Sequence, residues 1–296
     1  MGTLVASAIA IDFGYCPEGL SLNTSLIKIS ALPNLREAVD LVAKSPEVDG
    51  DWIFVQSSTH GSRVFGLPKT HTFQHSAADG LDHINFHIWA LSFFLGMRLT
   101  ATEAGFVDAT PIKPRKLTDF HLGNQGLEKS LDITEQFWQS HRAHPERAKI
   151  YSAAIHALFI AQYPRALQFE QFMFLYASLD ACFALASCLH TPRRGLTHAA
   201  RIEWMCMLFG MPVPDWAFTA HTRHSQLSVI RNAAIHEAIF MGEPLGFAVH
   251  GAGTNQNITL EMEALICRLL VALIGADTAA YVRTTVSTRQ MHGLDL

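Results

Sequence analysis

The pattern of apolar and polar positions divides the chain into two parts of different character. Up to about residue 120, short apolar runs alternate with turn residues, as is typical of a mixed α/β domain. Within this part, Leu35, Val39 and Val42 recur at helical spacing and predict a short helix over 33–44. The predicted strands, which are rich in Val, Ile or Thr, are 3–13, 24–30 and 51–57.

Helical periodicity dominates the second part of the chain. The segment 109–126 separates the two parts, because its two Pro, two Gly and small basic cluster interrupt any regular pattern. After it, the apolar positions predict helices over 127–143, 146–162, 165–189, 198–209, 225–241 and 258–275. We therefore expect an α+β protein, with a mixed α/β domain over 1–120 followed by an all-α helical bundle over 127–285.

Composition narrows the class of protein. The chain has 296 residues, of which 49% are apolar and 16% are charged, so it has enough apolar side chains for a large core. Its net charge of −4 argues against a protein that coats nucleic acid non-specifically, because such binding needs many Lys and Arg side chains. A localised basic site is compatible with this charge.

Neither the apolar runs nor the cysteines indicate a membrane or secreted protein. The runs 84–96 and 264–276 are shorter than the ~20 residues that cross a bilayer, and 81–99 fits either a helix or a buried pair of strands. The first residues resemble a strand more than a signal peptide. No CxxC pair occurs among Cys16, Cys182, Cys188, Cys206 and Cys267. We expect a cytoplasmic protein with reduced cysteines and no membrane contact.

Three polar residues stand out in the predicted helix 225–241. Its sequence "LSVIRNAAIHEAIF" places Arg231, Asn232 and His236 among apolar neighbours. Asn232 and His236 share a face, whereas Arg231 and His236 are rotated by roughly 140° in an α-helix. His can transfer a proton near neutral pH, and Arg offers a fork of donors for phosphate oxygens. The trio therefore indicates either a phosphate-directed site or the solvent-facing stripe of an amphipathic helix.

Asp180 is a further candidate for this site. It lies in the middle of the apolar helix 165–189, where an unpaired carboxylate would be costly. We expect a partner for it, and Arg231 would serve if Asp180 orients its guanidinium across the bundle. The alternatives are Arg201 or exposure on the outer face of the helix.

Basic residues near the predicted helix are candidates for binding the substrate. His221, Arg223 and His224 precede the helix and could contact phosphates at the mouth of a cleft. Arg193 and Arg194 lie in an earlier loop between helices, where they form either a phosphate-binding patch or a solvated loop near a helix end.

We expect no metal site and no cofactor. His221 and His224 form a His-x-x-His pair, but the only further His at a sensible spacing is His236, which the polar trio already uses. No nucleotide-binding glycine loop occurs in the chain. We also find no metal-binding spacing among the first-half residues His60, His71 and His75.

In its context, the trio resembles the signature of the HEPN superfamily, which is Arg, a polar residue that is often Asn, three variable residues and His. It lies on the penultimate predicted helix of the bundle, and the helix that contains "FLYASLDAC" precedes it. The chain is most similar to the group of bacterial HEPN domains called Apea-like, and the resemblance covers about residues 127–285.

The resemblance implies a metal-independent ribonuclease in which Arg231 and His236 are catalytic and Asn232 supports them. The 2′-hydroxyl of the RNA would attack the adjacent phosphate at a composite site shared by two copies of the chain. The expected roles are those of a toxin or an antiphage defence effector, with an antitoxin or another regulatory partner. The alternative is an inactive HEPN module that dimerises and binds a nucleotide or a protein.

Overall fold

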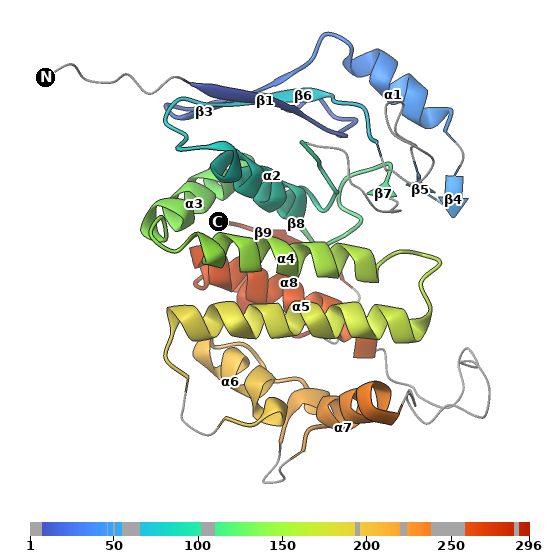
Figure 1. Cartoon of the computed structure of the whole chain (residues 1–296), viewed down its shortest axis with the longest axis vertical. Helices are drawn as coiled ribbons and strands as arrows, with labels where there is room; N and C mark the ends of the chain where they lie inside the picture. Colours follow the sequence, from blue (N-terminus) through green and yellow to red (C-terminus); the bar gives the residue numbers. More distant parts are fainter. Residues whose placement is uncertain are drawn as a thin grey trace, which may run out of the picture. The chain divides into compact units, whose positions relative to one another are not determined.

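Contacts divide the chain into two compact units, which are described separately (Figure 1). Unit 1 contains Met1–Arg142, Tyr163–Arg165 and Leu296, and unit 2 contains Ala143–Gln162 and Ala166–Asp295. The computed structural model describes residues 8–45, 47–49, 51–54, 66–101, 110–192, 196–219, 224–237, 258–286 and 290–296. These residues form helices and small sheets, so the expected α+β class is confirmed.

A four-stranded antiparallel sheet organises unit 1, with the strand order β1-β6-β3-β2. The strands are β1 (Ile9–Phe13), β2 (Leu22–Asn23), β3 (Ile27–Ala31) and β6 (His71–His75). Because side chains alternate between the faces of a strand, His71, Phe73 and His75 share one face of β6. All three are fully buried, so the period of the strand directs His75 into the core.

The remaining strands of unit 1 are short. A second sheet has the order β4-β5-β7, and β8 lies later in the unit. The bounds are β4 (Glu47–Asp49), β5 (Trp52–Ile53), β7 (Thr110–Pro111) and β8 (Phe120–Leu122). The predicted strand 24–30 is thus found as β3, and the described part of the predicted strand 3–13 contains β1. Only the first residues of the predicted strand 51–57 are described.

Three helices complete unit 1. The first, α1 (Leu35–Ala43), forms where the sequence predicts it. The second, α2 (Leu81–Leu95), shows that the apolar segment 81–99 is a helix and not a pair of strands, and Gly96 ends it in the left-handed conformation. The third, α3 (Gly126–Ser140), packs beside α2 (Figure 1).

The position of α3 differs from the predicted domain boundary at 109–126. Leu131 of α3 belongs to the same core cluster as Ile84 of α2 and Phe73 of β6, so α3 lies with unit 1. The Pro- and Gly-rich segment is a connection inside unit 1, because both of its short strands belong to that unit. The break in the sequence pattern therefore marks a loop, and the division between units falls after Arg142.

Unit 2 is helical, as expected. Its α-helices are α4 (Pro145–Ala161), α5 (Gln168–Leu189), α6 (Arg201–Leu208), α7 (Gln226–Asn232) and α8 (Ile258–Val271). The turns of π-helix Ala233–Glu237 and Ala272–Ala276 extend α7 and α8. The short elements are the 3-10 turns His198–Ala200, Asp215–Ala217 and Ala280–Arg283 and the strand β9 (His292–Leu294).

The long helix α5 is central to unit 2. It contacts α4 and α8, and Phe172, Leu175 and Cys182 on it are fully buried. Ser178 Oγ donates a 2.8 Å hydrogen bond to the Ala154 carbonyl of α4. Of the described helices, α5 alone has the length and apolar composition of a membrane span. Of its most apolar stretch of 18 residues, 44% is buried within the protein.

A fully buried arginine fastens the end of unit 2 to α8. Arg268 of α8 donates hydrogen bonds to the Ala264 carbonyl at 2.7 Å, to Thr284 Oγ1 at 2.8 Å and to the Thr285 carbonyl at 3.1 Å. Its guanidinium also lies 4.7 Å from the centroid of the Tyr281 ring. A buried charge is tolerated only when it is hydrogen-bonded, so these contacts hold Arg268 in one position. Arg268 therefore connects α8 to residues 281–285.

We predict that Arg268→Met lowers the free energy of unfolding by about 3 kcal/mol, because it leaves buried carbonyl oxygens without donors. Urea denaturation followed by circular dichroism measures the change. Arg283→Met is the matched control, since Arg283 is exposed, and it should change stability by less than about 0.5 kcal/mol. Equal, small effects of both substitutions would contradict the structural role of Arg268.

Candidate functional site

The helix that carries Arg231 and Asn232 begins at a reciprocal cap. Ser225 Oγ accepts a 3.2 Å hydrogen bond from the Ser228 amide, and Ser228 Oγ accepts a 2.9 Å bond from the Ser225 amide. Such a pair satisfies two amides that the first turn of a helix leaves free. Leu227 anchors the same turn in the core. The start of α7 is therefore fixed, and with it the direction of its last turn.

Arg231 and Asn232 interact directly at the end of α7. Arg231 Nη1 donates a 3.0 Å hydrogen bond to Asn232 Oδ1. The guanidinium lies 5.7 Å from the centroid of the Tyr176 ring on α5. Burial raises the pKa of the Tyr176 hydroxyl, as does the nearby Asp180 carboxylate, whereas Arg231 opposes this rise. The guanidinium is thus positioned by an amide on its own helix and by an aromatic ring on another.

The backbone after Asn232 changes from α-helix to π-helix over Ala233–Glu237. A π-helix joins residues five apart through its hydrogen bonds and turns through a smaller angle per residue than an α-helix. The rotation between positions 231 and 236 is therefore smaller than the roughly 140° of an α-helix. Position 236 lies within this turn, but the side chain of His236 is outside the described residues.

Asp180 pairs with Arg201 and not with Arg231, the partner that a role in catalysis would require. Its Oδ1 lies 3.1 Å from Arg201 Nη1, the alternative partner considered from the sequence. The guanidinium of Arg201 also lies 4.5 Å from the centroid of the Phe183 ring. Asp180 is partly exposed and not a deeply buried carboxylate, so the pair with Arg201 is enough to satisfy it.

Two guanidinium groups, those of Arg201 and Arg231, lie near His198 on the same surface. Burial lowers the pKa of His198, and the charges of Arg201 and Arg231 lower it further while Asp180 opposes them. A small hollow lies beside these groups. Its polar lining consists of Tyr176, Asp180, His198, Arg201, Ser225 and Ser228.

The other residues expected to bind substrate are mostly outside the described part of the chain. Of this set, only His224 is described, and it is exposed directly before α7. The residues that lie outside the described ranges are Arg193, Arg194, His221 and Arg223.

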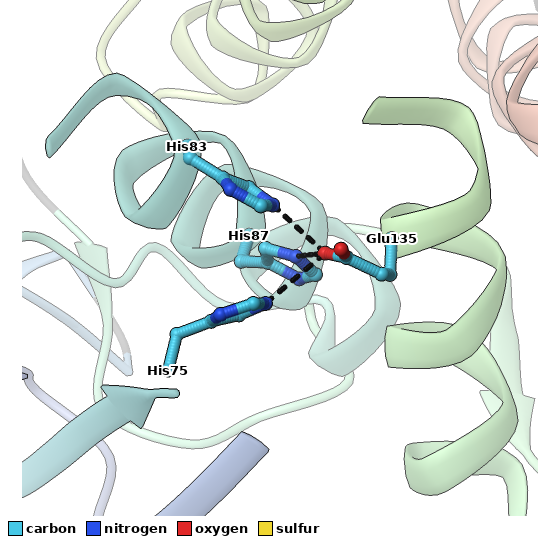
Figure 2. A group of neighbouring side chains, drawn as sticks. All are labelled: His75, His83, His87 and Glu135. Carbon is cyan, nitrogen blue, oxygen red and sulfur yellow. Dashed lines mark hydrogen bonds and ion pairs between the residues drawn. The ribbon is translucent and has the colours of Figure 1, made fainter. Parts of the chain in front are cut away.

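A second cluster, which the sequence analysis did not identify, lies in unit 1 (Figure 2). The Nε2 atoms of His75, His83 and His87 lie 3.2, 2.8 and 2.9 Å from Oε2 of Glu135. Strand β6 supplies the first ring, α2 supplies the second and third, and α3 supplies the carboxylate. The side chains of the three His are fully buried, and that of Glu135 is 12% exposed.

A surrounding group of polar and aromatic side chains holds the cluster. His83 Nδ1 lies 3.2 Å from Asp79 Oδ1, and the Trp138 ring stacks on the His83 ring with centroids 4.6 Å apart. Asp79 Oδ2 accepts from Trp138 Nε1 at 3.3 Å and lies 2.8 Å from Arg142 Nε. The ring of His83 is consequently held by stacking on one face and by the hydrogen bond at Nε2, and Asp79 lies close to Nδ1 without the geometry of a hydrogen bond.

The cluster strongly perturbs its acid and base groups. Burial alone would raise the pKa of the Glu135 carboxyl, but the hydrogen bonds from the three His and from Gln139 outweigh it and hold that pKa far below its usual range. Burial lowers the pKa of His87 to about 4, although Glu135 opposes the shift. Glu135 is therefore ionised and His87 is neutral at pH 7, which are the states in which both side chains bind metals.

The sequence contains one local signal for this cluster. His83 and His87 are four residues apart in a very apolar segment, and that spacing places both rings on one face of a helix. The apolar pattern alone leaves this segment open between a helix and a pair of strands. The partner, Glu135, is 48 residues further along the chain, and nothing local connects it to α2.

Comparisons with models of protein families, with curated proteins and with solved structures found no match to this chain. The HEPN resemblance therefore rests on the residues of α5 and α7 themselves.

Proposed function

We propose that the chain is a metal-independent endoribonuclease of the HEPN type. Arg231 and His236 are its catalytic residues, and Asn232 positions Arg231. The observation that carries this proposal is the π turn after Asn232. The widened turn reduces the angle between positions 231 and 236, so an arginine and a histidine five residues apart can be directed at one phosphate. Turns of π-helix occur frequently at functional sites, which is consistent with this role.

The hydrogen bond from Arg231 to Asn232 Oδ1 supports the proposed division of roles. A guanidinium held by a neighbouring amide keeps a fixed orientation, and its planar fork of donors suits phosphate oxygens. Tyr176 lies against the same guanidinium and restricts its motion. The arginine is thus suited to stabilising the negative charge that develops on a phosphate during the reaction.

The proposed reaction needs only proton transfer and charge stabilisation. The RNA 2′-oxygen forms a bond to the adjacent phosphorus as a base removes its proton, and the bond from phosphorus to the 5′-oxygen breaks as that oxygen gains a proton. The products are a 2′,3′-cyclic phosphate and a 5′-hydroxyl. His236 serves as the acid or base, and Arg231 stabilises the pentavalent phosphorane.

The proposed biological setting follows the HEPN resemblance. We place the protein in the cytoplasm as a toxin or antiphage defence effector, restrained or activated by an antitoxin or another partner. Its net charge of −4 favours capture of RNA by a focused cationic site over a broad basic surface. Arg201 and Arg231, whose charges both act on His198, provide a cationic group of this kind in unit 2.

We predict that the full chain cleaves RNA and that Arg231→Ala and His236→Ala each slow cleavage by at least about 100-fold. The rate is measured on a labelled oligonucleotide, and the ends are identified by mass. Arg283→Ala and His144→Ala are matched controls at exposed positions and should cleave at the parental rate.

An oligonucleotide with a single 2′-deoxy nucleotide at the cleaved position tests the mechanism independently of the protein. It should resist cleavage there, because the attacking oxygen is absent. Cleavage at the deoxy position, or equal rates for the parent and both catalytic variants, would contradict the ribonuclease proposal. Equal rates with intact dimers would favour the alternative, an inactive HEPN module.

The proposed dimer has support from α7. Val229 is 56% exposed, which leaves an apolar side chain on the helix that carries Arg231 available to a second copy. We predict that Val229→Glu shifts the protein toward monomers in light scattering and lowers cleavage at least 10-fold. Leu260→Glu, an exposed apolar position on α8, is the control and should leave both properties unchanged. A fully active Val229→Glu monomer would exclude a composite site that involves α7.

A further inference from the structure

We propose that His75, His83, His87 and Glu135 bind one divalent transition-metal ion in unit 1, with the ligand chemistry of Zn²⁺. The ligand atoms are Nε2 of each His and Oε2 of Glu135, and these four atoms all lie within 4.8 Å of one another. Figure 2 shows the three rings directed at the same carboxylate. This site is separate from the proposed ribonuclease residues, which belong to unit 2.

The ligand types and their spacing suit this class of ion. Imidazole nitrogen and carboxylate oxygen are ordinary Zn²⁺ ligands, with bonds of about 2.0–2.2 Å. His83 and His87 are four apart on α2, which is the spacing that presents two imidazoles to one metal from one helix face. The remaining ligands come from other elements, so the donors approach from more than one direction, as a tetrahedral ion requires.

The three oxygen-to-nitrogen distances are close to those of a tetrahedral site. In a tetrahedral site with bonds of about 2.05 Å, neighbouring ligand atoms are roughly 3.3 Å apart. Glu135 Oε2 lies 3.2, 2.8 and 2.9 Å from the three nitrogen atoms, within about half an ångström of that value. Small changes in the Glu135 side-chain torsions would supply the difference, because its carboxylate enters from the partly exposed side.

Without a cation, the hydrogen bonds of the cluster are poorly balanced. Three N–H groups would have to donate to one carboxylate oxygen, which has two lone pairs. His87 Nδ1 is buried and has no hydrogen-bond partner among the described residues. Buried polar atoms are nearly always paired, so both features call for an explanation. A cation at the centre removes the competition of three N–H groups for one oxygen, because the three nitrogen atoms and the oxygen then all bind the ion.

The surroundings of His83 match those of a metal ligand. Histidines that bind metals usually donate their other N–H to a carboxylate, which fixes the tautomer and the ring orientation. His83 Nδ1 lies 3.2 Å from Asp79 Oδ1 without the geometry of a hydrogen bond, and a small rotation of the Asp79 carboxylate would let Nδ1–H donate to it and leave the Nε2 lone pair facing the ion. Asp79 is itself held by Trp138 and Arg142. This arrangement makes Asp79 a positioning residue for the metal site.

One contact opposes binding and can be weighed. His75 Nδ1 accepts a 3.1 Å hydrogen bond from the Ala77 amide, which places the single proton of a neutral ring on Nε2. Coordination through Nε2 therefore breaks that bond, because the proton moves to Nδ1. The loss of one neutral hydrogen bond is small beside the free energy with which structural zinc sites bind. We expect His75 to be the weakest of the four ligands.

Burial indicates a structural and not a hydrolytic centre. All four positions are supplied by the protein and the three rings are fully buried, whereas a catalytic zinc keeps one position open to water. The ion would join β6, α2 and α3, which are otherwise held by apolar packing. Metal binding should therefore appear as a gain in the stability of unit 1.

The full chain, purified after growth with added Zn²⁺, is expected to hold about one metal equivalent by elemental analysis. Removal of the metal with dipicolinate should lower the melting temperature, and one equivalent of Zn²⁺ should restore it. Co²⁺ added to the stripped protein should give the intense visible absorption of a tetrahedral site at one equivalent. Failure to retain or bind metal under all three conditions would overturn the proposal.

Substitutions locate the metal within the chain. Glu135→Gln keeps hydrogen-bonding capacity but removes the anionic ligand, and His83→Ala with His87→Ala removes the helical pair. Each should abolish stoichiometric binding, whereas Asp79→Asn should weaken Zn²⁺ affinity about 10–100-fold. His121→Ala is the matched control, because this exposed histidine lies in β8 of the same unit.

Two outcomes would contradict the assignment of the ligands. One is unchanged binding by Glu135→Gln together with unchanged binding by the His83 and His87 double variant. The other is loss of metal in His121→Ala. If a ligand variant fails to fold, the Co²⁺ spectrum of the parent and the graded effect of Asp79→Asn still decide the matter. Ribonuclease activity is not a readout of this experiment, so its outcome is independent of the proposed function.

Discussion

The ionised carboxylate of Glu135 is the interaction on which unit 1 depends. A buried anion is stable only when its charge and lone pairs are satisfied, and here three imidazoles from two different elements approach one oxygen. That requirement fixes the faces of β6, α2 and α3 relative to one another. Apolar packing of the same elements supplies bulk stability, whereas the polar cluster selects their rotation and register.

Unit 2 also contains a buried ionised side chain, but different groups stabilise it. The buried guanidinium of Arg268 donates hydrogen bonds to carbonyl and hydroxyl oxygens within the unit. These neutral oxygens stabilise the cation without a carboxylate. Arg201 of α6 and Arg231 of α7 are instead partly accessible. Groups that are polar, cationic and incompletely buried are suited to an external anion, whereas Arg268 is suited only to holding the fold.

Periodicity predicted most elements, because burial of one face is a local property of the sequence. The helices α4–α8 and the strands β1 and β3 were found close to their predicted positions. Two features of the second part could not be predicted from local pattern. The partner of Asp180 depends on how α6 packs on α5, and the π turn after Asn232 changes a helical angle that the sequence alone leaves at its α value.

The missed His cluster shows the same limit more clearly. The strand period placed His75 beside Phe73 on the buried face, and the helical spacing paired His83 with His87, but each signal is ordinary when taken alone. Only the fold brings them to Glu135, which lies in the predicted helix 127–143. The break at 109–126 added to the difficulty, because it suggested that Glu135 belonged to a different domain from the three histidines.

X-ray absorption spectroscopy of the zinc-loaded full chain tests the central claim most directly. The account predicts four nitrogen or oxygen ligands at about 2.0–2.1 Å, with the multiple-scattering pattern of several imidazoles and no sulfur. That result separates the cluster from the five cysteines elsewhere in the chain. A shell containing sulfur at about 2.3 Å, or a six-coordinate shell dominated by water, would contradict it.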